Sequence, residues 1–252
     1  MKLIFAIPVL FLLSFNGHAQ DATVKDSTAL DSVGKPKFNY KALAIPAALI
    51  GYGLIGIESD QIKSFNTQIR AEVTEDIDEK LTIDDFSQYA PAASVFALDW
   101  MGVKAKHSLR DRSVILATSY LILSGTVLGL KSGTKIERPD GTSKNSFPSG
   151  HTATAFAGAE MMYQEYKDQS IWYGVAGYAV ATGTGLFRMY NNRHWLTDVA
   201  AGAGIGILST KIAYWVNPYL SKKLFGKEKK TTTLFSPTYD GKTLGIGLVR
   251  MF

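Results

Sequence analysis

The chain has 252 residues, of which 46% are hydrophobic, and its mean hydropathy of +0.02 is close to zero. This composition allows one helical domain with a substantial core but is too polar for a bundle that lies wholly in lipid. The net charge of +5 is modest, and no basic stripe is interleaved with aromatic residues, which argues against nucleic acid as a partner. The lack of cysteine excludes a disulfide framework and thiol chemistry.

Residues 1–20 predict a secretory signal peptide. A charged start precedes an apolar run over residues 3–15, and small residues follow it. Because the run is too short to cross a bilayer comfortably, we expect cleavage near Ala19 or Gln20 rather than a retained anchor. The polar residues 21–39 are expected to form a flexible lead-in.

Apolar and polar blocks alternate over residues 40–220, which predicts one helical domain. The expected helices are 42–57, 62–81, 90–101, 113–130, 150–166, 171–186 and 195–216. The second is amphipathic and is expected to lie on a surface. The block Gly202-Ala-Gly204-Ile-Gly206 imitates a dinucleotide-binding fingerprint, but it falls inside a predicted helix, so we interpret it as a site of close helix packing.

The C-terminal residues 221–252 change character. A basic linker leads to a predicted hairpin, in which Asp240-Gly241 is a strong turn signal between strands 231–235 and 244–249. A loose tail is the alternative for this segment.

Three short blocks carry residues suited to phosphate chemistry. In the last block Asp198 follows His194 by four positions in a predicted helix, so both side chains share one face. The carboxylate can hold one imidazole nitrogen protonated and leave the other to attack phosphorus. In the middle block His151 follows Pro-Ser-Gly at a helix N-terminus, where backbone N–H groups favour an anion.

Three cations complete the set. Lys131, Arg138 and Arg188 can stabilise a phosphoryl transition state whose charge is spread over three oxygens, which is the work that a metal ion does in other phosphatases. No metal or other cofactor is therefore expected. His107, which lies in a basic stretch, and His18 have no plausible partner nearby and are not assigned to the site.

The blocks resemble the type 2 phosphatidic acid phosphatase family, which shares its site and helical fold with class A acid phosphatases and vanadium haloperoxidases. The family pattern K-x6-R-P, P-S-G-H and S-R-x5-H-x3-D matches residues 131–198. The resemblance implies an all-α bundle of about six core helices. It also assigns roles, listed by residue: His194 as nucleophile through a phosphohistidine, His151 as general acid and base, Asp198 as the residue that orients His194, and Lys131, Arg138, Arg188, Ser149 and Gly150 as phosphate-binding residues.

One position departs from the pattern. Phe187 stands where the family usually has serine, so the hydrogen bond from that hydroxyl to phosphate is missing. By resemblance the substrate is a lipid phosphate or diphosphate, such as phosphatidate, undecaprenyl diphosphate, phosphatidylglycerol phosphate or a lipid A phosphate. The alternatives are a soluble class A-like acid phosphatase, a vanadium-dependent haloperoxidase and a non-catalytic lipid-phosphate binder.

The charge pattern places the site outside the cytoplasm of a bacterial cell envelope. If the helices run up and down, the three blocks gather at one end of the bundle, and the basic residues 104–112 and 222–230 gather at the other. The positive-inside rule then predicts an inner-membrane protein with a periplasmic site. Membrane lipids are its expected partners. A cleaved signal peptide conflicts with this orientation, because it leaves the new N-terminus in the periplasm and three membrane crossings before Lys131 would then bring the site into the cytoplasm. One of the predicted helices before Lys131 must therefore fail to span the membrane. A soluble periplasmic bundle is the alternative, supported by Glu160, Glu165 and Lys211 in core helices. The sequence does not determine the oligomeric state.

Overall fold

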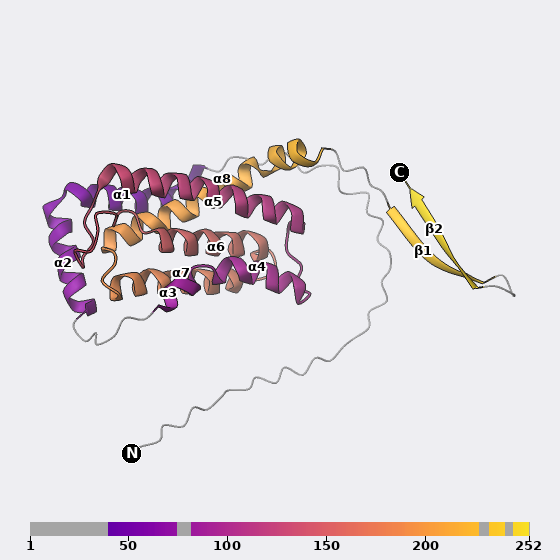
Figure 1. Ribbon diagram of the computed structural model, residues 1–252, viewed down its shortest axis with the longest axis horizontal. Helices are drawn as coiled ribbons and strands as arrows, with labels where there is room; N and C mark the ends of the chain where they lie inside the picture. Colours follow the sequence, from indigo (N-terminus) through magenta and orange to yellow (C-terminus); the bar gives the residue numbers. More distant parts are fainter. Residues whose placement is uncertain (1–39, 75–81, 227–231, 240–243, 252) are drawn as a thin grey trace, which may run out of the picture. The chain divides into compact units, whose positions relative to one another are not determined.

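Helices form the part of the chain that carries the three blocks (Figure 1). The structure, a computed structural model, describes residues 40–74, 82–226, 232–239 and 244–251. The signal peptide, the lead-in, the end of the 62–81 helix, Lys227, Lys229, Lys230 and the Asp240-Gly241 turn lie outside the described residues. After a 3-10 turn, Tyr40–Leu43, the helices are α1 (Ala44–Glu58), α2 (Asp60–Thr74), α3 (Ile83–Ser87), α4 (Ala90–Trp100), α5 (Leu109–Thr134), α6 (Gly150–Tyr166), α7 (Ile171–Tyr190) and α8 (Leu196–Phe225).

The helical architecture of the described residues 40–74 and 82–226 confirms the expected all-α fold class, with eight helices rather than about six. Helices α5, α7 and α8 are longer than predicted, and local contacts set the start of α5 and the end of α8. The hydroxyl of Ser108 accepts a hydrogen bond from the backbone N–H of Asp111 and starts α5 at Leu109. Helix α8 continues through Pro218 and ends at Gly226, which has a φ of 70°. The sequence prediction missed the short helix α3.

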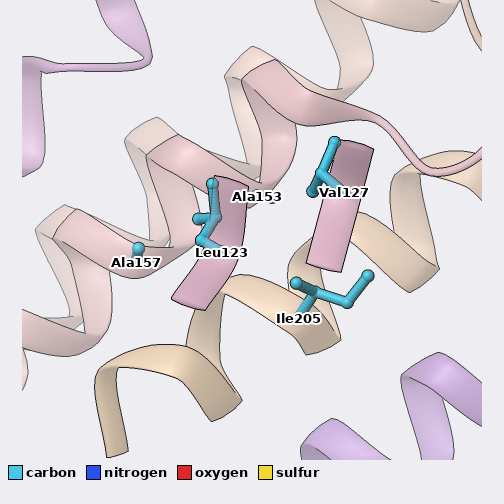
Figure 2. Packing of buried hydrophobic residues seen from close by; sticks show 5 residues of the cluster. All are labelled: Leu123, Val127, Ala153, Ala157 and Ile205. Atoms are coloured by element: carbon cyan, nitrogen blue, oxygen red, sulfur yellow. The ribbon is translucent and has the colours of Figure 1, made fainter. Parts of the chain in front are cut away.

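Helix α6 is the centre of the bundle and contacts α4, α5, α7 and α8. Its alanines at 153, 155, 157 and 159 are at most 1% exposed, so it is buried on all faces and its small side chains let neighbouring helices come close. Figure 2 shows one such contact, in which Leu123 and Val127 of α5 and Ile205 of α8 pack around Ala153 and Ala157.

The glycines of α8 confirm the predicted close packing. A Cβ added at Gly202 would lie 2.5 Å from the backbone oxygen of Ser149, and one at Gly206 would overlap the backbone oxygen of Ala153, both in or beside α6. A Cβ at Gly204 would lie 2.7 Å from the backbone oxygen of Pro46 in α1. The glycine block therefore places α8 against α6 on one face and α1 on another.

The bundle has two ends, which we call the site end, where α6 and α8 begin, and the basic end, where they finish. Helix α1 runs antiparallel to α8, since Gly56 lies beside Thr197 and Pro46 beside Gly204. The α3–α4 segment then returns toward the basic end, and α5 leads back to the site end. Tyr40 and the catalytic blocks thus lie at opposite ends.

Three helical stretches of the described residues are long and apolar enough to cross a membrane. They are Tyr40–Glu58, Leu109–Thr134 and Leu196–Phe225. Helix α4, with 11 residues, is too short to be among them.

At the C-terminus, β1 (Thr232–Tyr239) and β2 (Leu244–Met251) pair in an antiparallel ladder, with Thr232 opposite Met251 and Tyr239 opposite Leu244.

Candidate active site

The three blocks meet at the site end of the bundle, as the up-and-down arrangement predicts. The last turn of α5 and the loop after it supply the first block, and the N-terminus of α6 supplies the second. The end of α7, the turn after it and the first turn of α8 supply the third. A backbone hydrogen bond of 3.0 Å from the N–H of Ser149 to the oxygen of Asp198 joins the second block to the third.

His194 and Asp198 form the buried centre of this region, 3% and 1% exposed respectively. The Nδ1 of His194 lies 3.5 Å from Oδ2 of Asp198. The same carboxylate oxygen accepts a 2.9 Å bond from the backbone N–H of Trp195 and a 2.5 Å bond from the hydroxyl of Ser146. With Nδ1 turned to the carboxylate, Nε2 is the ring nitrogen left to attack a substrate.

The environment keeps His194 neutral. Burial lowers the pKa of His194 to about 4, and the nearby charges of Arg188 and Lys131 act in the same direction, while Asp198 opposes them. At neutral pH the ring therefore carries a lone pair, which is the form that a nucleophile requires.

Lys131, in the last turn of α5, and Arg138, in the loop after it, supply two cations of the first block. The Nζ of Lys131 donates to the backbone oxygens of Asn145 and Ser146, and the Nε of Arg138 donates to Oδ1 of Asn145 at 2.9 Å. Within the described residues these direct contacts are with uncharged oxygens. The positive charge of both side chains thus remains available to an anion.

Arg188 is the most buried of the three predicted cations, at 8% exposed. Its Nη1 lies 2.5 Å from Oδ2 of Asp84 in α3, and the other oxygen of Asp84 accepts a 2.9 Å bond from Asn191. Its Nε is buried and has no hydrogen-bond partner among the residues that the structure describes. A buried guanidinium that is anchored on one side and has an unused donor on another is suited to binding an anion.

His151 lines a cavity together with Arg138 and Arg188. The cavity has a volume of about 360 Å³ and is lined by Thr82, Asp84, Asp85, Arg138, His151, Arg188, Asn191 and Arg193. The Nε2 of His151 lies 2.9 Å from Oδ1 of Asp85. Burial and Arg188 lower the pKa of His151 from its ordinary value of 6.5, and Asp85 and Asp84 oppose them.

Ser149, Gly150 and Phe187 complete the predicted set. Ser149 is fully buried, and its hydroxyl caps α6 by accepting from the N–H of Thr152, so it is engaged within the fold. Gly150 begins α6, where the N–H groups of the first turn lack helical partners. The ring of Phe187 packs edge-on against Tyr190, with centroids 6.2 Å apart, which gives this position a packing role.

The carboxylates beside His151 also form the one group among the described residues with ligand atoms close enough for a metal ion. One atom from each of Asp84, Asp85 and His151 lies within 4.8 Å of the others. However, Nη1 of Arg188 lies 2.5 Å from Asp84 and 4.0 Å from Asp85, so a guanidinium already supplies positive charge to these carboxylates. The residues fit a metal ion poorly.

Farther from the site, the expectation that His107 lacks a partner is wrong. Its Nδ1 lies 2.9 Å from Oε1 of Glu165, which also accepts from the hydroxyl of Tyr214. Glu160 pairs with Lys211 at 2.6 Å. His18 lies outside the described residues.

The sequence reasoning missed several residues of the site. Asp84, Asp85, Asn191 and Arg193 line the cavity, and Ser146 binds Asp198. Arg193 and Asn191 lie inside the spacing between Arg188 and His194, where the pattern allows any residue. No local motif singles out the two aspartates.

Comparisons with known proteins agree with this geometry. Lipid A 1-phosphatase from Porphyromonas gingivalis is 37% identical over 165 residues, which are 65% of this chain and 37% of that protein. Bacitracin transport permease protein BcrC from Bacillus licheniformis is 36% identical over 77 residues, 31% of this chain and 36% of that protein. The chain thus spans little more than a third of the length of these relatives.

The fold is similar to that of a transmembrane PAP2-type phosphatidylglycerolphosphate phosphatase from Bacillus subtilis. That crystal structure is 18% identical, with a TM-score of 0.51, and the similarity covers 70% of this chain and 97% of the other. The sequence model of the PAP2 superfamily matches residues 109–222, which include α5 to α8 and all three blocks. This part of the chain is therefore similar in sequence to the PAP2 superfamily.

Proposed function

We propose that the protein is a metal-independent phosphatase that hydrolyses a lipid phosphate or diphosphate through a phosphohistidine intermediate. The observation that carries this proposal is a buried, neutral His194 held by Asp198, with Arg188 and Lys131 close enough to lower its pKa. The match of residues 109–222 to the PAP2 superfamily model and the 37% identity to a lipid A 1-phosphatase support it.

In the first step Nε2 of His194 attacks phosphorus in line with the leaving oxygen. The N–P bond forms while the P–O bond to the lipid breaks, and His151 gives its proton to the departing oxygen. Lys131, Arg138 and Arg188 bind the equatorial oxygens, where the transition state carries its negative charge. Asp198 stabilises the positive charge that develops on the ring of His194.

In the second step water replaces the lipid. His151, now neutral, removes a proton from the water as its oxygen attacks phosphorus, and the N–P bond breaks to release inorganic phosphate. His194 is neutral again and His151 is protonated, so the cycle closes without a change in either residue.

We place this activity in a membrane. Three stretches are long and apolar enough to cross a bilayer. The buried charges that favoured a soluble bundle are paired inside the fold, Glu160 with Lys211 and Glu165 with His107, and do not need water around them. Phosphorylated lipids are therefore the proposed substrate class rather than water-soluble phosphate esters.

The proposed orientation puts the site in the periplasm, as the positive-inside rule requires for basic residues at the opposite end. Lys104, Lys106, Lys222 and Lys223 lie at the basic end among the described residues. Because Tyr40 also lies at that end, a periplasmic site requires Tyr40 on the cytoplasmic side of the membrane. A cleaved signal peptide would instead leave Tyr40 on the periplasmic side, so this orientation conflicts with cleavage.

The orientation is tested with reporters fused after Pro139. A reporter that is active only in the periplasm should work there, and activity of a cytoplasmic reporter at the same junction would refute the orientation.

The activity is tested by phosphate release from purified lipid phosphates, including lipid A and phosphatidylglycerol phosphate, with p-nitrophenyl phosphate as the water-soluble comparison. His194→Ala should abolish turnover, and the wild type should yield an acid-labile phosphoenzyme after a rapid acid quench. Retention of more than about a tenth of wild-type kcat in His194→Ala would refute the mechanism. Halide oxidation after addition of vanadate, without phosphate release, would favour the haloperoxidase alternative.

A further inference from the structure

Helix α3 brings two carboxylates into the candidate site, although it lies outside the three blocks. Asp84 is 1% exposed and binds Arg188 and Asn191 of the α7 region. A second contact, 2.8 Å between the hydroxyls of Ser87 and Thr184, fixes the other end of α3 to α7. Helix α3 is therefore docked at both ends, which gives the residue that follows Asp84 a defined place.

That residue is Asp85, and it faces His151. Its Oδ1 lies 2.9 Å from Nε2 of His151, within hydrogen-bond distance, and 4.0 Å from Nη1 of Arg188. The proposed mechanism uses His151 but does not use Asp85. An imidazole that gives up a proton from one nitrogen needs its ring orientation fixed through the other, and a carboxylate is a common partner for that purpose.

We propose, on the basis of the proposed phosphatase function, that Asp85 is a positioning residue for His151. It accepts a hydrogen bond from Nε2–H and so makes Nδ1 the nitrogen that exchanges the proton with the leaving oxygen and then with water. Asp85 does not touch the substrate. It stabilises the imidazolium form of His151 and fixes the tautomer of the neutral form, so that Nδ1 is the nitrogen that gives up and takes back a proton in every cycle.

The charges around His151 allow this effect to be measured. The groups that face it are Asp84 and Asp85 from α3, Arg188 from α7, Arg138 from the α5–α6 loop and Arg193 from the α7–α8 turn. Arg188 disfavours the imidazolium, and Asp85 is the carboxylate that contacts the ring. Removing the charge of Asp85 should leave His151 among cations and make it lose its proton at lower pH.

The test compares Asp85→Asn and Asp85→Glu with the wild type in two assays on the full chain in detergent. For a lipid phosphate, whose leaving alkoxide needs a proton, Asp85→Asn should lower kcat about tenfold or more and move the alkaline limb of the pH profile by about one unit toward acid. For p-nitrophenyl phosphate, whose leaving group is a weak base, the rate of phosphoenzyme formation in a rapid-quench experiment should change by less than about twofold. Asp85→Glu should restore most of the lipid activity.

Asp60→Asn is the matched control. Asp60 is also an exposed carboxylate in a helix near the site end, paired with Lys63, and its loss should leave both assays unchanged. Superimposed pH profiles for Asp85→Asn and wild type, or equal losses with both substrates, would overturn the role of Asp85 while leaving the phosphatase proposal intact. A wild type that releases no phosphate from any substrate would overturn both.

Discussion

The contribution of Asp198 is the sharpest test of the proposed nucleophile. One oxygen, Oδ2, receives the hydroxyl of Ser146 at 2.5 Å, the N–H of Trp195 at 2.9 Å and Nδ1 of His194 at 3.5 Å. In Asp198→Asn the amide oxygen can keep the two shorter bonds, but the charge is lost and an NH2 group replaces the second oxygen. The proton of the neutral imidazole is then no longer held on Nδ1, so the tautomer with the proton on Nε2, which cannot attack phosphorus, becomes populated.

The expected loss follows from these distances. Replacing the aspartate of a tightly bonded triad costs about 10⁴ in kcat. Because the His194–Asp198 contact is longer than a normal hydrogen bond, we expect about 10³, or ~4 kcal/mol of transition-state stabilisation. Ser146→Ala removes one support and leaves the carboxylate, so its loss should be about tenfold.

The assay is kcat for phosphate release together with the yield of acid-labile phosphoenzyme, and thermal unfolding in detergent shows that each variant is folded. Asp168→Asn, which removes an exposed carboxylate paired with Lys106, is the control. An Asp198→Asn protein within about threefold of wild type would refute the orienting role.

The remaining predictions concern pH, inhibition and packing. The pH profile of kcat/KM should have an acidic optimum. Activity should fall below pH 4, where His194, with a pKa of about 4, becomes protonated, and should fall again at higher pH, where His151, whose pKa is lowered from 6.5, loses its proton. An optimum above pH 8 would contradict these roles. Vanadate should inhibit at roughly micromolar concentration because it adopts the shape of the transition state. EDTA should have no effect, because cations of the protein replace a metal ion. Loss of activity in EDTA that magnesium restores would refute the metal-independent mechanism. Gly202→Ala should destabilise the protein by about 1–3 kcal/mol in thermal unfolding, since its Cβ would lie 2.5 Å from the oxygen of Ser149, whereas Gly125→Ala, with nothing within 4 Å, should not. Equal unfolding temperatures for the two variants would show that α8 can shift at no cost.

The sequence by itself determined the features that depend on short spacing. His194 and Asp198 were expected to meet because they are four positions apart, and they do, although His194 lies in the turn just before α8 and not within the helix. The N-terminus of α6 follows from Pro-Ser-Gly before an apolar run. The glycine block in α8 indicated close packing, since helix geometry puts Gly202 and Gly206 on one face. These patterns depend on the regular geometry of one element and can be read without its neighbours.

Only the tertiary structure decided which distant side chains meet. Asp85 lies 66 positions before His151, Asp84 lies 104 before Arg188, and Ser146 lies 52 before Asp198, so no local spacing connects these residues. The partners of the buried charges were hidden in the same way, since Glu160 finds Lys211 only when α6 packs against α8. Burial of a charged or polar group is stabilising only when a partner is within reach, and that depends on how the helices pack. The sequence therefore predicted the three blocks, and the packing of α3 against α7 added the carboxylates that complete the candidate site.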